Sequence, residues 1–329
     1  VSWEPGFEVL AIPFDTPITG YKTDNAVNLR LWKAEADSNL DFQSFNEGDF
    51  IGAVYDKLTS ENISKVLYPN DSTRSGKELR LMQQFFFVSA TLQDIIRYRI
   101  RANELPLERM YEKITMQLND THPSIAVAEM MRLLVDEHQL TWDAAWKVTT
   151  KTFAYTNHTL LPEALEKWPK AMMEKILPRH VEIILEINYH FLNEVREHFP
   201  GDEDRIGRMS IIDESGEQYI RMAHLAIVGS YAVNGVAELH TELLTTEVLH
   251  DFYEMWPDKF SNKTNGVTPR RWLITSNYQL AEVITREIGE GWKTDLKMLK
   301  KLEKTAASKT FVKTWQKAKI AAKARLSER

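Results

Sequence analysis

Strand-like segments alternate with helix-like segments along the middle of this chain, and that alternation limits the possible folds more than any other feature. Residues 114–118 and 153–156 are short β-prone runs, and each leads through a polar turn into a helical pattern. An apolar run at 226–230 predicts a buried strand, and residues 178–198 predict a long helix. Strands that alternate with helices indicate an α/β fold with a largely parallel sheet.

Three polar clusters stand where these strands are expected to end and helices to begin. They are Asn-Asp-Thr-His at 119–122, Asn-His-Thr at 157–159, and the pairs Gly-Ser and Asn-Gly within 229–235. Ligands of open α/β sheets bind outside the carboxyl ends of the strands, where helix N-termini supply free N–H groups. Because Asn, Asp and Thr are also ordinary helix caps, one such cluster indicates only a cap. Three clusters with two histidines favour a site for a polar ligand.

The two histidines, His122 and His158, have several possible roles. Each could serve as a metal ligand, a general base or a hydrogen-bond donor. No second histidine or carboxylate stands at ligand spacing on the same expected helix, so we expect no metal. The sequence also lacks a G-x-S-x-G elbow, a G-x-G-x-x-G fingerprint and a P-loop, which argues against a serine hydrolase and a nucleotide-binding fingerprint.

Charge and composition narrow the class of protein. The chain has 329 residues, enough for two domains, and a net charge of −6, which gives no general attraction to nucleic acid or anionic membranes. No apolar run is long enough to cross a bilayer, so we expect no membrane partner. The sequence contains no cysteine, which fits a reducing compartment and leads us to expect a cytoplasmic protein.

Two segments near the end of the chain leave alternatives open. Residues 293–329 are strongly basic and carry apolar residues at helical spacing, so they form either a nucleic-acid or membrane-surface helix or a helix docked by one apolar stripe. The low number of arginines favours docking, and we expect no nucleic-acid partner. Residues 262–272 combine an Asn-Gly turn with two arginines and a tryptophan. They suit either an anionic, planar partner or a structural linker.

Taken together, several long motifs resemble those of the α-glucan phosphorylase family (glycogen, starch and maltodextrin phosphorylases). They follow one another in the family's order over nearly the whole chain. The motifs are VLYPND at 66–71, GKELRL at 76–81, QLNDTHP at 117–123, AYTNHT at 154–159, LPEALE at 161–166, LPRH at 177–180, AVNGVA at 232–237 and NKTNGVTPRRW at 262–272.

The resemblance implies a glycosyltransferase-B type fold in which the active site lies between two Rossmann-like domains. Residues 1–265 would form the C-terminal part of the first, glucan-binding domain. Residues 266–329 would form the interdomain crossover and the first helices of the second domain. The resemblance also implies an internal stretch of a longer enzyme, without its N-terminal segment and without the domain that carries the cofactor lysine. We therefore expect the isolated chain to be inactive.

The same resemblance implies a function. The complete enzyme would phosphorolyse terminal α-1,4-linked glucose of a glucan with inorganic phosphate, releasing glucose 1-phosphate with retention. It would use pyridoxal phosphate, whose 5′-phosphate takes part in proton transfer, and it would be a homodimer. Two alternatives remain: a non-catalytic carbohydrate-binding fragment, and a retaining glycosidase with two carboxylates about 5 Å apart.

The residues that match the family's sugar site occur in three of these motifs. His158 matches the histidine whose side chain holds the glucose 6-hydroxyl and whose carbonyl faces the developing positive charge. Asn265 matches an asparagine that binds the same hydroxyl. Asp120 and His122 match an active-site pair close to the sugar. Asparagine and histidine both donate and accept hydrogen bonds, which suits the recognition of neutral hydroxyls.

The remaining matches concern the gating loop and the cofactor. Asn70 and Asp71 stand at the start of the loop expected to cover the substrate, and Asp71 supplies its carboxylate. Ser72 departs from the family, many members of which carry an asparagine there that touches the sugar. Trp272 matches a tryptophan packed near the cofactor. The sequence therefore predicts catalytic roles for His158, Asp120, His122 and Asp71, whereas Asn70 and Asn265 bind substrate.

Overall fold

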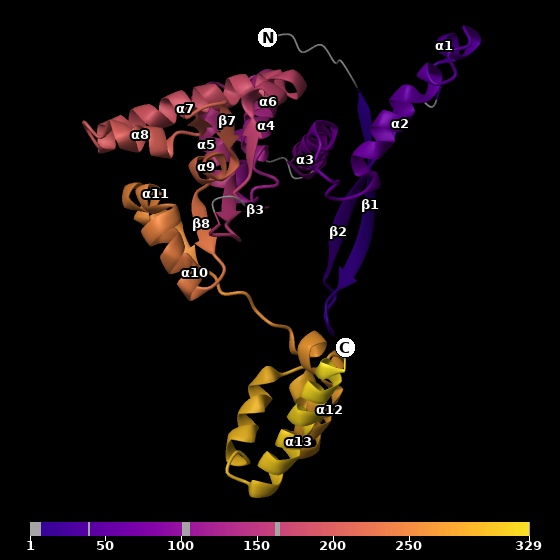
Figure 1. The fold of residues 1–329 in the computed structure, drawn as a ribbon, viewed down its shortest axis with the longest axis vertical. Coiled ribbons are helices and arrows are strands. Elements are labelled where there is room, and N and C mark those ends of the chain that lie inside the picture. The colour runs from indigo at the N-terminus through magenta and orange to yellow at the C-terminus, as the bar shows by residue number, and fades with distance from the viewer. Residues whose placement is uncertain (1–7, 39, 101–105, 162–164, 329) are drawn as a thin grey trace. The chain divides into compact units, whose positions relative to one another are not determined.

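A computed structural model describes residues 8–38, 40–100, 106–161 and 165–328 of the chain, with side chains of 98–100 excepted (Figure 1). The chain divides into two compact units, Val1–Thr264 and Asn265–Arg329. The first unit contains the predicted α/β sheet. The second consists of helical segments and short connections in the part of it that the structure describes.

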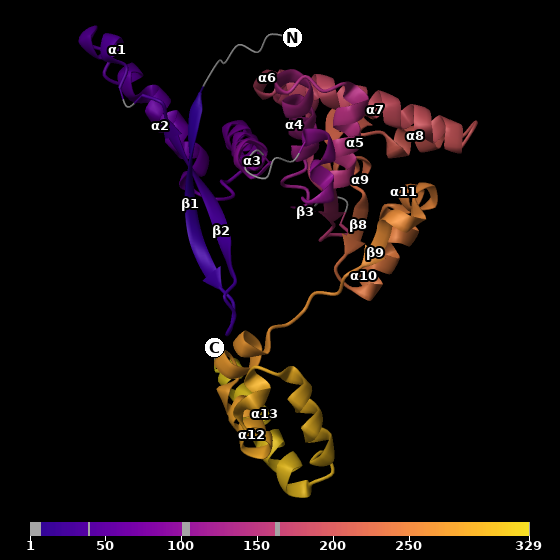
Figure 2. The same cartoon turned by 180° about the vertical axis from the view of Figure 1, so that it is seen from behind.

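A four-stranded parallel sheet forms the centre of the first unit. Its strands are β3 (Met116–Asn119), β4 (Phe153–Thr156), β8 (Ala232–Gly235) and β9 (Phe260–Asn262), in the order β3-β4-β8-β9. Neighbouring pairs run parallel, so all four strands end at the same edge of the sheet (Figure 2). The predicted α/β class with a parallel sheet is confirmed, and it is consistent with a glycosyltransferase-B type domain.

Helices and the sheet share one apolar core cluster. The helices that contribute to it include α4 (Ala126–Arg132), α5 (Trp142–Thr152) and α7 (Pro178–His198), and α7 packs on α4. The side chain of Thr141 caps α5, and Pro178 begins α7 at a position where its missing N–H costs no hydrogen bond. The predicted long helix over 178–198 is thus confirmed. Tyr155 of β4 is fully buried in the core cluster that strands and helices share.

The expected strand at 226–230 is wrong. Residues 226–228 instead end helix α9 (Met222–Val228), and the neighbouring strand β8 starts at Ala232. Leu225, Ala226 and Ile227 are completely buried. A helix buried on all sides has no polar face, so its short apolar run has the same pattern as a buried strand.

A long antiparallel hairpin precedes this sheet in the chain. It consists of β1 (Val9–Thr19) and β2 (Ala26–Ala36), paired along their full length. Helix α2 (Gly52–Lys65) packs on β2, and α3 (Arg74–Asp94) completes a small core. Several apolar side chains of the hairpin remain exposed, among them Phe14, Ile18, Val27, Leu29 and Leu31.

A small antiparallel sheet joins three short strands in the order β5-β7-β6. They are β5 (Lys167–Pro169), β6 (Ile212–Asp213) and β7 (Tyr219–Arg221). The other segments of the first unit are helical and lie mainly around the two sheets. They are α1 (Phe42–Asn46), η1 (Ile95–Ile100), η2 (Leu107–Glu112), η3 (Leu133–Glu137), α6 (Lys170–Ile176), α8 (Glu203–Met209), α10 (Glu238–Leu243), η5 (Leu244–Val248), α11 (His250–Met255) and η6 (Pro257–Lys259).

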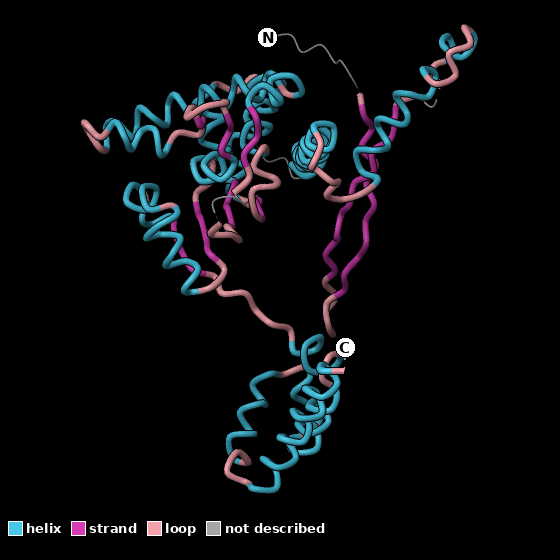
Figure 3. Tube along the Cα trace, in the orientation of Figure 1, coloured by secondary structure: helices cyan, strands magenta, loops and turns pink. Residues whose placement is uncertain are grey.

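The second unit packs its helices around the buried Trp292, whose indole N–H donates to Thr285 Oγ1 at 3.1 Å. Helical segments make up most of this unit (Figure 3). Its segments are η7 (Arg270–Thr275), α12 (Tyr278–Ile288), η8 (Glu290–Lys293), η9 (Leu296–Lys304) and α13 (Lys309–Ser327). The described part of the basic tail forms η9 and then α13, and α13 packs on α12 and buries Ala318. The interpretation of a docked helix fits this packing.

Candidate active site

Polar side chains at the carboxyl edge of the parallel sheet link three strands through hydrogen bonds. Gln117 Nε2 donates to Thr156 Oγ1 at 2.8 Å, and Thr156 Oγ1 donates to Asn234 Oδ1 at 2.8 Å. His158 Nε2 lies 2.6 Å from Asn119 Oδ1. Because the amide oxygen can only accept, Nε2 carries the proton in this pair. Asn119, His158 and Asn234, one from each expected polar cluster, therefore lie at one edge, as the parallel register requires. The pair Gly-Ser at 229–230 was expected there too, but it precedes β8 and lies at the opposite, amino-terminal edge, because the expected strand at 226–230 is a helix.

Asn157 fixes the backbone that carries His158. It is 1% exposed, and its Oδ1 accepts from the Thr159 N–H and from His240 Nε2, each at 3.1 Å. Its Nδ2 donates to the hydroxyl of Tyr155 at 3.2 Å. A buried asparagine with all these partners is rigid. The neighbouring His158 side chain, by contrast, is exposed at the edge of the sheet and accessible to a ligand.

His240 of α10 completes this arrangement, and no local sequence pattern revealed it. Its Nδ1 accepts from the N–H of Val236 at 3.1 Å, so the proton lies on Nε2, the atom that donates to Asn157. Burial lowers the pKa of His240, and the nearby His158 lowers it further. Both effects favour the neutral, singly protonated ring that this pair of hydrogen bonds needs.

Asp120 makes the turn that follows β3. Its φ of +72° lies in the left-handed region, which aspartate adopts more readily than most residues. Its N–H donates to the Thr156 carbonyl at 3.0 Å, and its carboxylate accepts from the Thr121 N–H at 2.6 Å. This turn holds the Asp120 carboxylate at the carboxyl edge and sets the position of His122.

His122 and Asp71 belong to one cluster, connected by two residues that the sequence analysis had not singled out. His122 Nδ1 lies 3.2 Å from the Tyr68 hydroxyl, and the Tyr68 ring lies 5.6 Å from the guanidinium of Arg80. Arg80 Nη1 donates to Asp71 Oδ2 at 3.0 Å. The side chain of Asn70 accepts from the backbone of Ser72 at 2.9 Å, which stabilises the turn between the loop and α3.

Glu166 is a buried carboxyl group beside this cluster. Its Oε1 accepts from Gln84 Nε2 at 2.8 Å and lies 3.8 Å from Arg80 Nη2, whereas Oε2 has no hydrogen-bond partner among the residues that the structure describes. Burial raises the pKa of Glu166; Gln84, His122 and Arg80 oppose the rise, and Asp120 adds to it. The result is a carboxyl group that holds its proton more tightly than usual.

Asn265 and Trp272 belong to the second unit, so their roles in a shared site stay predictions. Both are exposed, and the Trp272 side chain leaves 58% of its surface accessible. The backbone of Trp272 donates to the Thr268 carbonyl at 3.1 Å, which begins η7. An exposed indole beside Arg270 and Arg271 offers a flat apolar face and two cations.

Residues 1–329, the complete chain, match the family model described as Carbohydrate phosphorylase. The chain belongs to this family. It is 58% identical to a glycogen phosphorylase of Synechocystis sp., over 97% of the chain and 38% of that relative. It is 51% identical to glycogen phosphorylase 2 of Dictyostelium discoideum, over 100% of the chain and 33% of the relative. It is also 51% identical to the brain form of glycogen phosphorylase from Rattus norvegicus, over 97% of the chain and 39% of that relative.

This carbohydrate phosphorylase chain therefore spans between 33% and 39% of the length of these relatives. In the part of the phosphorylase chain that is described, no helix is both long and apolar enough to cross a membrane. The same residues contain no group of three or more His, Cys, Asp or Glu side chains that could hold a metal ion.

The phosphorylase site contains residues that spacing alone could not reveal. Tyr68 and Arg80 come from the loop and helix that follow α2, and Glu166 follows β4. They meet His122 only because the fold brings together positions 40 or more residues apart. Each of the three stands in a motif that resembles the family, Tyr68 in VLYPND, Arg80 in GKELRL and Glu166 in LPEALE, although residues 162–164 lie outside the described part.

Proposed function

We propose that the protein to which this chain belongs phosphorolyses terminal α-1,4-linked glucose of a glucan and releases glucose 1-phosphate. The relatives are named glycogen phosphorylases, and the matching family model covers the whole chain. The observation that carries the proposal is the polar carboxyl edge, where the exposed His158 is held by Asn119 and stands on the rigid Asn157 turn. Such an edge suits a neutral polyhydroxyl ligand.

His158 and Asn265 bind the 6-hydroxyl of the terminal glucose in this proposal. With its Nε2–H donated to Asn119, His158 offers Nδ1 as an acceptor for the hydroxyl proton. The amide of Asn265 can then donate to the hydroxyl oxygen. The His158 carbonyl, fixed by the neighbouring Asn157, faces the sugar ring, where positive charge develops during bond cleavage.

Asp120, His122 and Asp71 line the approach to the sugar, with Asn70 at the start of the covering loop. Oriented carboxylates stabilise a cationic transition state better than the mobile dipoles of water. Arg80 holds Asp71 at 3.0 Å and thereby keeps the loop next to α3. Tyr68 connects the same arginine to His122, so closure of the loop and placement of His122 are coupled through neighbouring side chains.

Pyridoxal phosphate is the cofactor that we propose for the complete enzyme, where its 5′-phosphate would take part in proton transfer with the substrate phosphate. The exposed indole of Trp272 and the neighbouring Arg270 and Arg271 fit a planar, phosphorylated ring in chemistry. Trp272 would pack against the ring and keep water from it. We place the complete enzyme in the cytoplasm as a homodimer, as the family resemblance implies.

A chimera tests the proposal. The matching segment of the Synechocystis glycogen phosphorylase, 58% identical to this chain, is replaced by residues 1–329. We expect glucose 1-phosphate to form from glycogen or maltodextrin only when inorganic phosphate is present. Glucose release without phosphate would indicate a retaining glycosidase instead. A folded chimera that binds maltodextrin but forms neither product would support the non-catalytic alternative.

The His158→Ala variant of this chimera should lower kcat more than it raises KM, because the contact strengthens as charge develops on the sugar. We expect a loss of about 2–4 kcal/mol in transition-state stabilisation. A glucan analogue without the terminal 6-hydroxyl should remove most of that difference. His250→Ala, at an exposed histidine of α11, is the matched control and should keep full activity. Intact kcat with a lower melting temperature would make His158 structural.

A further inference from the structure

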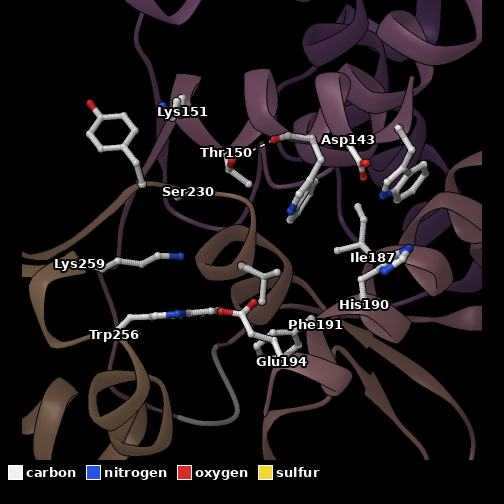
Figure 4. A pocket seen from close by; sticks show the side chains of 14 residues that line it. Asp143, Thr150, Lys151, Ile187, His190, Phe191, Glu194, Ser230, Trp256 and Lys259 are labelled. Carbon is white, nitrogen blue, oxygen red and sulfur yellow. Dashed lines mark hydrogen bonds between the residues drawn. The ribbon is translucent and has the colours of Figure 1, made fainter. Parts of the chain in front are cut away.

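A second pocket lies at the opposite, amino-terminal edge of the same parallel sheet, and the proposed phosphorolysis makes no use of it. Its volume is about 500 Å³ (Figure 4). Lys151 near the end of α5, Ser230 before β8 and Lys259 before β9 all line it. Helices α5 and α7 supply most of the remaining walls, together with Val228 at the end of α9, Tyr231 before β8 and Trp256 after α11. The pocket belongs entirely to the first unit.

Aromatic side chains make the walls of this pocket flat and apolar. Three of the nine tryptophans of the chain line it, namely Trp142, Trp146 and Trp256. Phe191 packs against Trp256 with ring centres 5.7 Å apart, and Tyr231 also lines the pocket. The three indoles are only partly buried, so a flat ligand can cover apolar surface that now faces solvent.

Lys259 brings an incompletely paired ammonium group to these walls. Its Nζ lies 3.7 Å from the centre of the Trp256 ring and donates one long hydrogen bond, 3.4 Å, to the Ile227 carbonyl. No described carboxylate lies within 4.0 Å of it. Burial lowers the pKa of Lys259 to about 8, and the more distant charge of Glu194 opposes this shift. Two of the three ammonium protons are thus available to a ligand.

Ser230 provides a second unused polar group in the same wall. It is fully buried, and its Oγ has no hydrogen-bond partner among the described residues. A buried hydroxyl without a partner is costly, so a ligand atom that bonds to it gains affinity. Ser230 precedes β8 and Lys259 precedes β9, so both line the pocket from the amino-terminal ends of neighbouring strands.

The other charged groups that face Lys259 decide which anion fits. Asp143 of α5 and Glu194 of α7 are exposed carboxylates, while Lys151 is an exposed cation. His190 of α7 is paired with Glu186 at 3.0 Å and lies away from Lys259 in Figure 4. Two carboxylates around the pocket disfavour a phosphate dianion more than a single negative charge. The apolar walls favour a flat body attached to that charge.

We propose that this pocket binds a monoanionic aromatic carboxylate. The carboxylate accepts from the Lys259 ammonium and the Ser230 hydroxyl, and the aromatic ring lies against the tryptophan walls. The bound anion stabilises the charged form of Lys259 and raises its pKa. The affinity for the carboxylate is therefore greatest below pH 8, where the Lys259 amine is already charged. Above pH 8 the affinity falls by up to about tenfold per pH unit, until the pH reaches the higher pKa of Lys259 in the complex.

Binding of 1-naphthoate to the 329-residue chain tests this site, with uncharged 1-naphthylmethanol as the matched ligand. Quenching of tryptophan fluorescence and calorimetry follow both ligands between pH 6 and pH 10. We expect the affinity for naphthoate, but not for the alcohol, to fall above about pH 8. The comparison of the two ligands needs no variant, so it remains valid whatever a substitution does to folding.

Lys259→Met keeps the apolar stem and removes the charge. This variant should bind naphthoate at least about tenfold more weakly, with no pH dependence, and should bind the alcohol as the unchanged chain does. Lys147→Met, at an exposed lysine of α5 outside the pocket, is the control and should have no effect. Equal binding of naphthoate by Lys259→Met would overturn the proposal. So would displacement of naphthoate by a neutral maltooligosaccharide whose binding ignores Lys259.

Discussion

Two buried glutamates show how neighbouring groups decide the state of a carboxyl group in this fold. Glu129 lies in the core, on α4, and Glu166 lies beside the candidate active site. Their side chains are 0% and 13% exposed, yet the pKa of Glu129 is lowered and the pKa of Glu166 is raised. Burial acts in the same direction on both, so the difference must come from their partners.

Glu129 has partners for both oxygens. Oε1 accepts from Ser89 at 2.7 Å and from Arg132 at 3.0 Å, while Oε2 accepts from Arg132 at 2.7 Å and from His180 at 2.6 Å. Burial alone would raise its pKa, but these hydrogen bonds and charges outweigh burial and bring the pKa down to about 2. Glu129 is therefore an ionised anchor between α3, α4 and α7.

Among the described residues, Glu166 accepts one short hydrogen bond, from Gln84, and its charged neighbours lie farther away. Burial therefore prevails and the pKa rises. Both oxygens of Glu129 accept hydrogen bonds from other residues of the core. Oε2 of Glu166, by contrast, has no hydrogen-bond partner among the described residues. Unused capacity in a buried carboxyl group is a feature of sites that bind or react rather than of sites that only stabilise.

The largest effect should follow from Glu129→Gln. The change removes the charge that compensates Arg132 and His180 in the core, and breaking a buried pair in this way costs about 3–5 kcal/mol of unfolding free energy. Urea denaturation at pH 7 measures the loss. Because the folded pKa is depressed to about 2, the advantage of Glu129 is complete above its unfolded pKa of about 4.3 and disappears as the pH falls toward 2.

Glu137→Gln is the matched control for that loss. Glu137 also pairs with Arg132, at 2.9 Å, but its side chain is 41% exposed. Exposed pairs contribute less than about 1 kcal/mol, so this variant should remain close to the unchanged chain. If Glu129→Gln and Glu137→Gln lost the same unfolding free energy, burial would not explain the strength of the Glu129 pair. The contrast drawn between Glu129 and Glu166 would then have no basis.

Arg80→Met should have an intermediate effect, about 1–2 kcal/mol, since it removes the cation shared by Asp71 and Glu166. It should also raise the pKa of Glu166 further and loosen the loop at 66–73. Hydrogen exchange of that loop and the pH at which the Glu166 carboxyl loses its infrared C=O stretch measure the two effects. Lys77→Met, at an exposed position of α3, should change neither.

Glu166→Gln should have the smallest effect and the opposite sign to Glu129→Gln. Since the folded pKa of Glu166 is raised, the folded chain binds more protons than the unfolded chain, and stability falls as pH rises from the unfolded pKa to the folded one. At pH 8 the glutamine variant should be as stable as the unchanged chain or up to about 1 kcal/mol more stable. A loss at pH 8 larger than about 1 kcal/mol would show that the ionised carboxylate is well paired.

The sequence was sufficient to predict that polar side chains meet at the carboxyl edge of the sheet. It was not sufficient to predict the cluster of Glu166, Gln84 and Arg80 beside that edge. The segments that become β3 and β4 end in polar residues before helices, and the parallel order of strands then places Asp120 and His158 at one edge. That inference needs only local patterns and one topological rule. The contacts of Glu166 with Gln84 and Arg80 join positions more than 80 residues apart, and no local pattern encodes them.

Burial explains the other differences from prediction. The apolar residues of α9 were expected to form a strand because a helix enclosed on all sides shows no period. Lys259 precedes the three-residue strand β9 and belongs to no recognisable motif, so its burial against the Trp256 ring is seen only in the structure. Both features are decided by what surrounds the segment, which a short window of sequence does not contain.

The hairpin of β1 and β2 has a consequence for how the chain behaves in solution. In the described part of the chain, the two strands pair only with each other, and β1 therefore has an outer side open to another strand, whereas the Ala34 N–H of β2 already donates to Ser64 Oγ of α2 at 2.8 Å. Phe14, Leu29 and Leu31 keep about half or more of their surface accessible. Open strand edges with apolar side chains are sites of intermolecular association. The isolated chain should therefore self-associate through this hairpin as its concentration rises.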